Sequence, residues 1–189
     1  MNIKKTANLL LNFAIKRLAE IFGIIIFASG VMLLIALITY SPEDPNFIFP
    51  DNDEIKNLLG FRGSFVSDLF FQSVGLIAYL VSYTFIVTGI NIFRIKEFFL
   101  ILENTFFCTL YILFGTLFLT SFYSGGFTLY INDNGGFIGN YLNQTFLGSL
   151  VSINEIMSYY FLILLILFLF LISVNFSLKK FYLSVKKIF

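Results

Sequence analysis

Residue types that carry much of enzyme chemistry are absent or scarce in this chain. It contains no histidine, and Cys108 is its only cysteine. Without histidine there is no Ser-His-Asp triad, no haem ligation by imidazole and no histidine metal site. A single cysteine provides neither an intrachain disulfide nor a cysteine cluster for zinc. These two absences exclude histidine-based hydrolases and haem ligation by histidine, as well as intrachain disulfide frameworks and cysteine zinc clusters.

Motifs for phosphate, metal and nucleophile chemistry are absent too. No Gly-Lys dipeptide occurs, so there is no Walker A phosphate loop, and no HExxH, GxSxG or CxxC sequence is present. No pair of carboxylates on facing apolar segments indicates a proton relay, and no basic patch interleaved with aromatic residues is large enough for nucleic acid. We therefore expect no catalytic, cofactor-binding or metal-binding residue, no cofactor, no direct nucleic-acid contact and no enzymatic activity.

Apolar residues are abundant instead. They make up 58% of the chain, whereas charged residues make up 12%, and the mean hydropathy is +0.90. Soluble domains carry roughly 25% charged residues, and a fold of this size cannot hide so much apolar surface from water. Four apolar runs long enough to cross a bilayer occupy about residues 21–39, 69–93, 105–123 and 156–174. The sequence thus predicts an all-α integral membrane protein with four transmembrane helices and amphipathic interfacial segments.

Two terminal pieces flank the predicted membrane domain of residues 21–174. Residues 1–20 carry four cations among apolar residues at helical spacing, which predicts an amphipathic helix lying on the membrane. A signal peptide is the alternative, but the next apolar run is too long for one and no Ala-x-Ala cleavage site follows. Residues 175–189 form a basic amphipathic tail or the start of a linker, expected to lie against an anionic leaflet.

Lysine and arginine are distributed unevenly about the predicted spans. Residues 1–20 contain four, the link 94–97 contains two and the tail contains four, whereas loop 40–68 contains two and loop 124–155 contains none. Cytoplasmic segments carry the excess of these residues in membrane proteins. The distribution predicts that both termini are cytoplasmic and that the two long loops lie outside.

The two long loops and the spans also contain local signals. Residues 55–71 are compatible with a helix, and the apolar spacing from Phe137 to Val151 predicts an amphipathic helix on the outer surface, with a re-entrant segment as the alternative. Gly75, Ala78 and Gly89 are candidate points of close helix contact, as is a small-residue notch at residues 28–30.

One acidic residue near the third span allows a second functional interpretation. An ionisable group deep in a bilayer costs several kcal/mol, so we expect Glu103 at the interface, with the membrane core beginning at Thr105. If Glu103 and Asn91 instead line a polar path with the threonine face from Thr105 to Thr120, the chain is a small polytopic transporter or channel subunit.

The first span leads into the sequence Thr-Tyr-Ser-Pro-Glu-Asp-Pro-Asn-Phe, residues 39–47. Pro42 and Pro45 lack the N–H that a continuing helix needs and push the preceding residue out of the α region, so the helix must stop here. Tyr40 is expected at headgroup depth, with its ring in apolar surroundings and its hydroxyl in water. Further along, Asp68 is placed to cap a helix N-terminus or to remain an exposed loop acid.

An apolar span that ends in this sequence resembles the first span and exit of the FtsK/SpoIIIE-type DNA translocases. The resemblance is strongest over about residues 30–80 and continues through Asn-x-x-Gly-x-x-Gly from Asn57 and Ala-Tyr-Leu from Ala78. Ser64 and Ser67 stand where the family usually has alanine, and Ser82 where it often has proline. The residues that we single out as candidate interaction or structural sites are Tyr40, Pro42, Asp44, Pro45, Asn57, Gly60, Gly63, Asp68, Gly75 and Tyr79.

The resemblance implies a multi-pass anchor in the bacterial inner membrane, located at the division septum and acting in cell division and chromosome segregation. In the family, four such spans precede a cytoplasmic linker and a hexameric ATPase that pumps DNA. No position here matches an ATPase residue, so we expect either a fragment or a protein that consists of the anchor alone. The implied partners are the lipid bilayer, other division membrane proteins and further copies of the chain.

Overall fold

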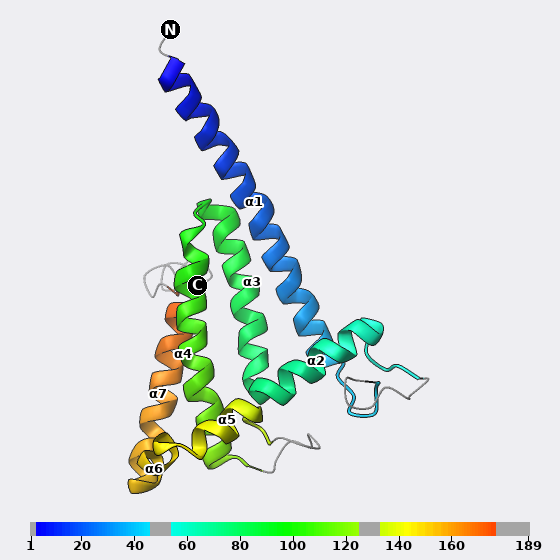
Figure 1. Ribbon diagram of the computed structural model, residues 1–189, viewed down its shortest axis with the longest axis vertical. Coiled ribbons are helices and arrows are strands. Elements are labelled where there is room, and N and C mark those ends of the chain that lie inside the picture. Colours follow the sequence, from blue (N-terminus) through cyan, green and yellow to red (C-terminus); the bar gives the residue numbers. More distant parts are fainter. Residues whose placement is uncertain (1–2, 46–53, 125–132, 177–189) are drawn as a thin grey trace, which may run out of the picture.

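The computed structural model describes residues 3–45, 54–124 and 133–176, which are helical with short connections and contain no β-strand (Figure 1). In chain order the elements are α1 (Ile3–Ile38), α2 (Gly60–Val74), the 3₁₀ turn η1 (Gly75–Ile77), α3 (Ala78–Ile95), α4 (Phe99–Phe122), α5 (Gly136–Asn143), α6 (Phe146–Ile153) and α7 (Glu155–Ser173).

Four helical segments are long and apolar enough to cross a membrane. They are Asn8–Ile38, Gly60–Ile95, Phe99–Phe122 and Glu155–Ser173. The prediction of an all-α membrane protein with four spanning helices is confirmed. In the second segment only α3 runs alongside the other long helices. Its 18 residues give a helix of roughly 27 Å, close to the thickness of the hydrocarbon core of a bilayer.

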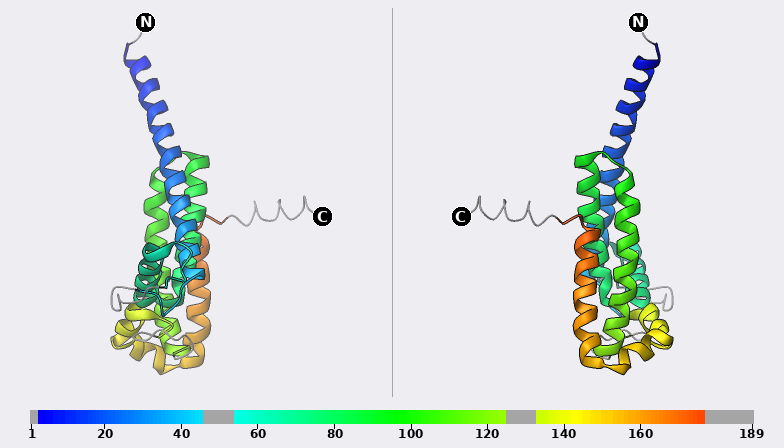
Figure 2. Two further views of the ribbon diagram at one scale, coloured as in Figure 1. Left: turned by 90° about the vertical axis from the view of Figure 1, so that its right-hand side faces the viewer. Right: turned by 90° about the vertical axis from the view of Figure 1, so that its left-hand side faces the viewer.

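The long helices pass back and forth between two ends of the bundle. At the end called here the loop end, α1 stops and α2, α5 and α6 gather; at the link end, residues 96–98 join α3 to α4 (Figures 1 and 2). The start of α1 projects past the link end, and α7 runs from the loop end toward it. The described parts of both termini therefore point the same way. The predicted basic tail lies outside the described residues, apart from its first two.

Two predicted segment boundaries are wrong. Residues 3–20 do not form a separate helix, because α1 runs through them without a break to Ile38; no glycine or proline interrupts the helix at residues 20–21. The predicted span 69–93 is not one helix, because it breaks at Gly75, whose φ of +59° lies in the left-handed region. Helix α2 consequently turns aside and lies across the end of α1, whereas α3 follows the bundle.

Glycines allow the backbones of α1 and α3 to touch. A Cβ added at Gly89 would lie 2.4 Å from the backbone nitrogen of Phe27, and one added at Gly23 would lie 2.8 Å from the carbonyl oxygen of Gly89. Gly30, seven residues after Gly23, faces the backbone nitrogen of Ile86 in the same way. Gly89 and Gly30 were predicted contacts, whereas Gly23 was not; the other two members of the predicted notch at residues 28–30 are exposed.

A substitution at Gly89 tests this contact. We expect Gly89→Ala to lower the thermal unfolding midpoint in detergent by several degrees, since overpacking against rigid backbone costs about 1–3 kcal/mol. Gly115→Ala is the matched control, because its Cβ would meet the end of the Ile77 side chain at 2.6 Å, and that end can rotate away. Equal losses in the two variants would contradict a backbone-to-backbone contact.

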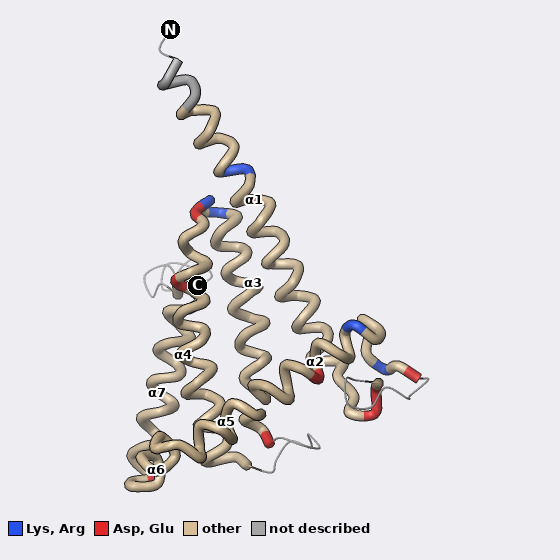
Figure 3. The backbone as a smooth tube through the Cα atoms, viewed as in Figure 1, with Lys and Arg blue, Asp and Glu red and all other residues tan. Residues whose placement is uncertain are grey.

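The main core lies toward the loop end and draws on all four long helices and α2. Phe71 and Tyr111 are fully buried there. The buried members of this cluster are Leu33, Leu37, Phe71, Val74, Ile77, Ala78, Val81, Cys108, Tyr111 and Leu169. Charged positions are instead found mostly near the two ends of the bundle (Figure 3). The core therefore fixes the positions of α2 and of the chain that leaves α1.

Candidate functional site

A buried carboxylate ties the exit of α1 to the chain that enters α2. Asp44 is only 1% exposed. Its Oδ1 accepts the backbone N–H of Lys56 at 2.9 Å, and its Oδ2 accepts that of Asn57 at 2.8 Å. On the surface beside it the Lys56 ammonium pairs with Glu43. Through this hydrogen bond the pKa of the Glu43 carboxyl is lowered and that of the Lys56 ammonium is raised from their usual values.

The side chain of Asn57 caps the end of α1. Its Nδ2 donates to the carbonyl oxygens of Ala36, at 2.9 Å, and Thr39, at 3.4 Å, while its Oδ1 accepts the N–H of Leu59 at 3.1 Å. The Thr39 hydroxyl oxygen in turn accepts the N–H of Leu58 at 3.2 Å. The last carbonyls of a helix have no partner within the helix. Asn57 supplies one from outside and thereby fixes where the loop returns to the bundle.

Small residues on α2 let it approach this polar region. The Ser64 hydroxyl donates to the carbonyl oxygen of Pro45 at 2.8 Å, and the Ser67 hydroxyl donates to that of Gly63, also at 2.8 Å. A Cβ at Gly63 would lie 2.2 Å from the Asn57 Oδ1. Only glycine therefore fits at residue 63 with Asn57 in place. At residue 64 serine adds a bond to the exit segment that the alanine usual in the family lacks.

Aromatic side chains join the same region to the core. Tyr40 donates its hydroxyl to Asp68 Oδ1 at 3.1 Å, and its ring centroid lies 4.9 Å from that of Phe71. Phe71 also packs edge-on against Tyr79 at 5.6 Å, and the Tyr79 hydroxyl donates to the carbonyl oxygen of Leu37 at 3.2 Å. Asp68 is buried and lies in the third turn of α2. It therefore neither caps this helix nor remains an exposed loop acid.

A second junction joins α5 to the break between α2 and α3 at Gly75, called here the α2–α3 elbow. The carbonyl oxygen of Asn134 accepts the N–H of Leu76 at 2.9 Å, and a Cβ on Gly75 would lie 1.8 Å from this same oxygen. A Cβ on Gly135 would lie 2.1 Å from the Thr120 hydroxyl oxygen. The Asn134 amide also donates to the carbonyl oxygen of Tyr123. The turn before α5 is thus held between the elbow and the end of α4.

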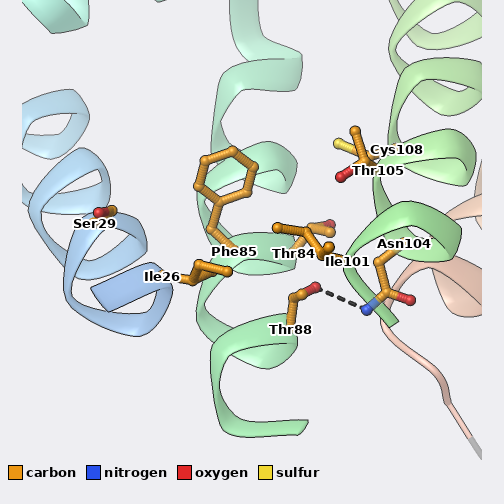
Figure 4. A pocket seen from close by; sticks show the side chains of 9 residues that line it. All are labelled: Ile26, Ser29, Thr84, Phe85, Thr88, Ile101, Asn104, Thr105 and Cys108. Atoms are coloured by element: carbon orange, nitrogen blue, oxygen red, sulfur yellow. Dashed lines mark hydrogen bonds between the residues drawn. The ribbon is translucent and has the colours of Figure 1, made fainter. Parts of the chain in front are cut away.

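A polar cluster nearer the link end joins α3, α4 and the end of α7. Asn104 donates to the Thr88 hydroxyl at 2.9 Å and to Asn175 Oδ1 at 3.0 Å, and Asn91 donates to the same oxygen at 3.3 Å. Beside it lies a cavity of about 150 Å³ between α1, α3 and α4, lined in part by Thr84, Thr88 and Asn104 (Figure 4). The cluster contains no charged side chain. It can bond helices together, but it offers no acid or base for catalysis.

Most of the predicted site residues meet at the loop end. Pro42 and Gly60 lie at its edge: Pro42 is half-buried, and Gly60 has a φ of +65° with open space where a Cβ would lie. Gly75 lies at the elbow. The residues that share the hydrogen-bonded and aromatic region around α2 are Tyr40, Asp44, Pro45, Asn57, Gly63, Asp68 and Tyr79. No observation tests whether any of the ten binds a partner, so that role stays a prediction.

The polar path that a transporter or channel subunit would need is not formed by these residues. Glu103 is exposed on α4, and so are Thr105 and Thr109, whereas Thr116 and Thr120 are buried. Sequence reasoning missed Thr88, Asn104 and Asn175 as one hydrogen-bonded set, because single polar residues in apolar runs carry no periodic signal. In the described part of the chain, no group of three or more cysteines and acidic residues could hold a metal ion.

These features define a class of protein: a four-helix integral membrane domain in which the described polar side chains hold helices and connecting segments together by hydrogen bonds. The chain belongs to the family described as the 4TM region of DNA translocase FtsK/SpoIIIE, which it matches over residues 15–186. With no Walker A sequence in its 189 residues, it represents the membrane domain of this family without the motor.

Individual relatives share a short stretch with it. The chain is 35% identical over 73 residues to DNA translocase FtsK of Caulobacter vibrioides, which covers 39% of this chain and 9% of the relative. It is 31% identical over 72 residues to DNA translocase FtsK of Rickettsia typhi, covering 38% and 10%, and 32% identical over 78 residues to that of Rickettsia bellii, covering 41% and 10%. The matched stretch is about a tenth of the length of these curated relatives. No solved structure matches the chain.

Proposed function

We propose that this domain anchors a DNA-translocating ATPase in the inner membrane at the division septum, where it acts in cell division and chromosome segregation. Both termini lie in the cytoplasm, so a motor attached after α7 faces the chromosome. The loop end lies outside and contacts other division membrane proteins, while copies of the domain assemble with one another. The domain itself does not touch DNA.

The observation that carries the proposal is the family match over residues 15–186 in a chain without a phosphate-binding loop. Relatives named DNA translocase are about ten times longer than the stretch they share with it, which leaves room in them for a motor. The ten lysines and arginines of the terminal segments and of residues 94–97, against two in the long loops, support cytoplasmic termini. The bonds around Asp44 and Asn57 give the loop end a defined surface for a partner.

A transporter or channel subunit is the second candidate. It requires Glu103, Asn91 and the threonines of α4 to line a common path. Glu103 is exposed on α4, whereas Asn91 is bonded to Asn175 at the end of α7. These polar groups are separate, and the geometry gives this function little support. Loss of a solute flux in both Glu103→Ala and Asn91→Leu would nevertheless favour it over anchoring.

Localisation of a fluorescent fusion tests the anchoring function. We expect the full chain, fused at its C-terminus to a protein that fluoresces only in the cytoplasm, to gather at mid-cell. We expect the double variant Pro42→Ala, Pro45→Ala to insert normally but to gather less. The reason is that both prolines restrict the path of the exit segment and Pro45 is bonded to α2 through Ser64.

The control carries Arg94→Gln at the link end, away from the outer loops. It is expected to insert and to gather at mid-cell as the parent does. A diffuse distribution of the parent chain around the whole membrane would contradict septal recruitment. Full recruitment of the double proline variant would remove the role given to the exit segment but leave membrane anchoring intact.

A further inference from the structure

A groove runs between one face of α1 and one face of α2. From α1 it is lined by Ser29, Met32 and Ala36, and from the α2 side by Leu59, the N-cap residue of α2, together with Arg62 and Val66. Its volume is about 330 Å³. Both sets recur at helical spacing, so each helix contributes one continuous strip of its surface. The groove exists because α2 turns away from α3 at Gly75 and crosses α1 near its end, as Figure 1 shows.

The groove is apolar except at one place. The Ser29 hydroxyl already donates to the carbonyl oxygen of Ile25 at 2.9 Å, so the end of the groove away from Arg62 offers no free donor. Arg62 is exposed and is the only charged residue of the lining. Within residues 3–45, 54–124 and 133–176 it has no acidic partner at ion-pair distance. The Arg62 guanidinium thus stands at one end of an apolar channel.

The depth of the groove matches that of a lipid. Ser29 lies nine residues before the end of α1 at Ile38, which is roughly 14 Å at 1.5 Å per residue. The channel therefore begins among the headgroups of the loop-end leaflet, where α1 stops, and descends into the hydrocarbon. Met32, which lines it, is 55% exposed, so the channel is open to the membrane beside Met32.

We propose that this groove binds one anionic glycerophospholipid, with an acyl chain between α1 and α2 and the phosphate on Arg62. The occupant must be apolar over most of its length and anionic at one end, which is the chemistry of this lipid class. Arginine can bind a phosphate with two parallel hydrogen bonds, and such charge-assisted bonds are among the strong ones. The bound lipid fills the space under α2 and holds that helix against α1.

Native mass spectrometry of the full chain in detergent tests the proposal. The probes are phosphatidylglycerol, phosphatidylcholine and soluble sn-glycerol 3-phosphate. We expect phosphatidylglycerol to bind best, and Arg62→Gln to weaken it about tenfold, as loss of a hydrogen bond to a charged group does. Arg62→Lys retains the cation and is expected to retain most of the binding. Arg94→Gln, which removes a cation at the link end, is the matched control and should not change it.

A second variant tests the acyl channel apart from the charge. Ser29→Phe places a ring at the inner end of the groove from an exposed position, and it should weaken phosphatidylglycerol binding while Arg62 remains. The proposal is overturned if Arg62→Gln and Ser29→Phe both bind this lipid like the parent. If phosphatidylcholine binds as well as phosphatidylglycerol, the groove makes ordinary lipid contact without recognising the headgroup. If glycerol phosphate binds as well as phosphatidylglycerol, the groove is an anion site that needs no acyl chain. Either result refutes the site as proposed.

Discussion

Replacing Gly75 with alanine is expected to separate α5 from the α2–α3 elbow and to lower the thermal unfolding midpoint by about 10 °C. Gly75 has a φ of +59°, and its added Cβ would lie 1.8 Å from the carbonyl oxygen of Asn134. That oxygen accepts the N–H of Leu76, so it cannot retreat without losing the bond. Backbone strain and overpacking together cost roughly 4 kcal/mol. Circular dichroism during heating in detergent measures the shift.

Gly60→Ala is the control for this prediction. Gly60 also has a positive φ, of +65°, but nothing lies within 4 Å of its added Cβ. The variant therefore carries only the backbone cost, about 1–2 kcal/mol for an ordinary residue in the left-handed region. We expect its midpoint to fall by less than half as much as that of Gly75→Ala. A comparable fall in both variants would mean that strain alone, and not the contact with Asn134, explains the effect.

The four membrane-crossing segments could be predicted from the sequence because length and hydropathy alone decide them. A run such as residues 156–174 must be helical in lipid, where every backbone polar group needs a partner within its own segment. Helix ends follow from equally local chemistry: α1 ends at Ile38, four residues before Pro42, and α7 begins beside Asn154, whose side chain accepts the N–H of Met157. These properties belong to single segments and need no knowledge of the fold.

The elbow at Gly75 could not be predicted in the same way. An apolar run continues through it, and glycine in a transmembrane segment more often marks a close contact than a break. The break depends on the turn at Asn134, which lies some sixty residues further along the chain. The glycine contacts of α1 with α3 likewise depend on which faces meet. Such features arise from tertiary packing. Hydropathy and periodicity describe one segment at a time and carry no information about contacts between segments.

The candidate site shows the same division between local and tertiary signals. The resemblance to the translocase family selected Asp44, Asn57 and Gly63, but it gave no physical reason for them. The structure supplies one, because Asp44 accepts the N–H groups of residues twelve and thirteen positions later and Asn57 reaches back to α1. Asp68 had two local interpretations, as a helix cap or a loop acid. Its actual position, buried against Tyr40, follows only once α2 lies across the end of α1.

Asp44→Ala is expected to release the first loop from the end of α1. Both oxygens of this buried carboxylate accept backbone N–H groups, and hydrogen bonds to a charged group contribute about 1.5–3 kcal/mol each. Removing the carboxylate leaves the N–H groups of Lys56 and Asn57 without these acceptors. We expect their hydrogen exchange to accelerate about a hundredfold, which corresponds to about 3 kcal/mol of lost protection. Exchange measured by mass spectrometry on peptides that cover residues 54–60 gives the result.

Two further variants decide whether this effect comes from the buried bonds. Glu43→Ala removes the exposed ion pair with Lys56 and should leave the exchange nearly unchanged, because exposed pairs contribute little. Asp44→Asn retains one acceptor oxygen but turns an NH₂ group toward the other N–H, so we expect an intermediate acceleration. If Glu43→Ala accelerates exchange as much as Asp44→Ala, the surface ion pair and not the buried carboxylate holds the loop. If Asp44→Asn matches the parent, a single hydrogen bond is enough to keep the loop on the end of α1.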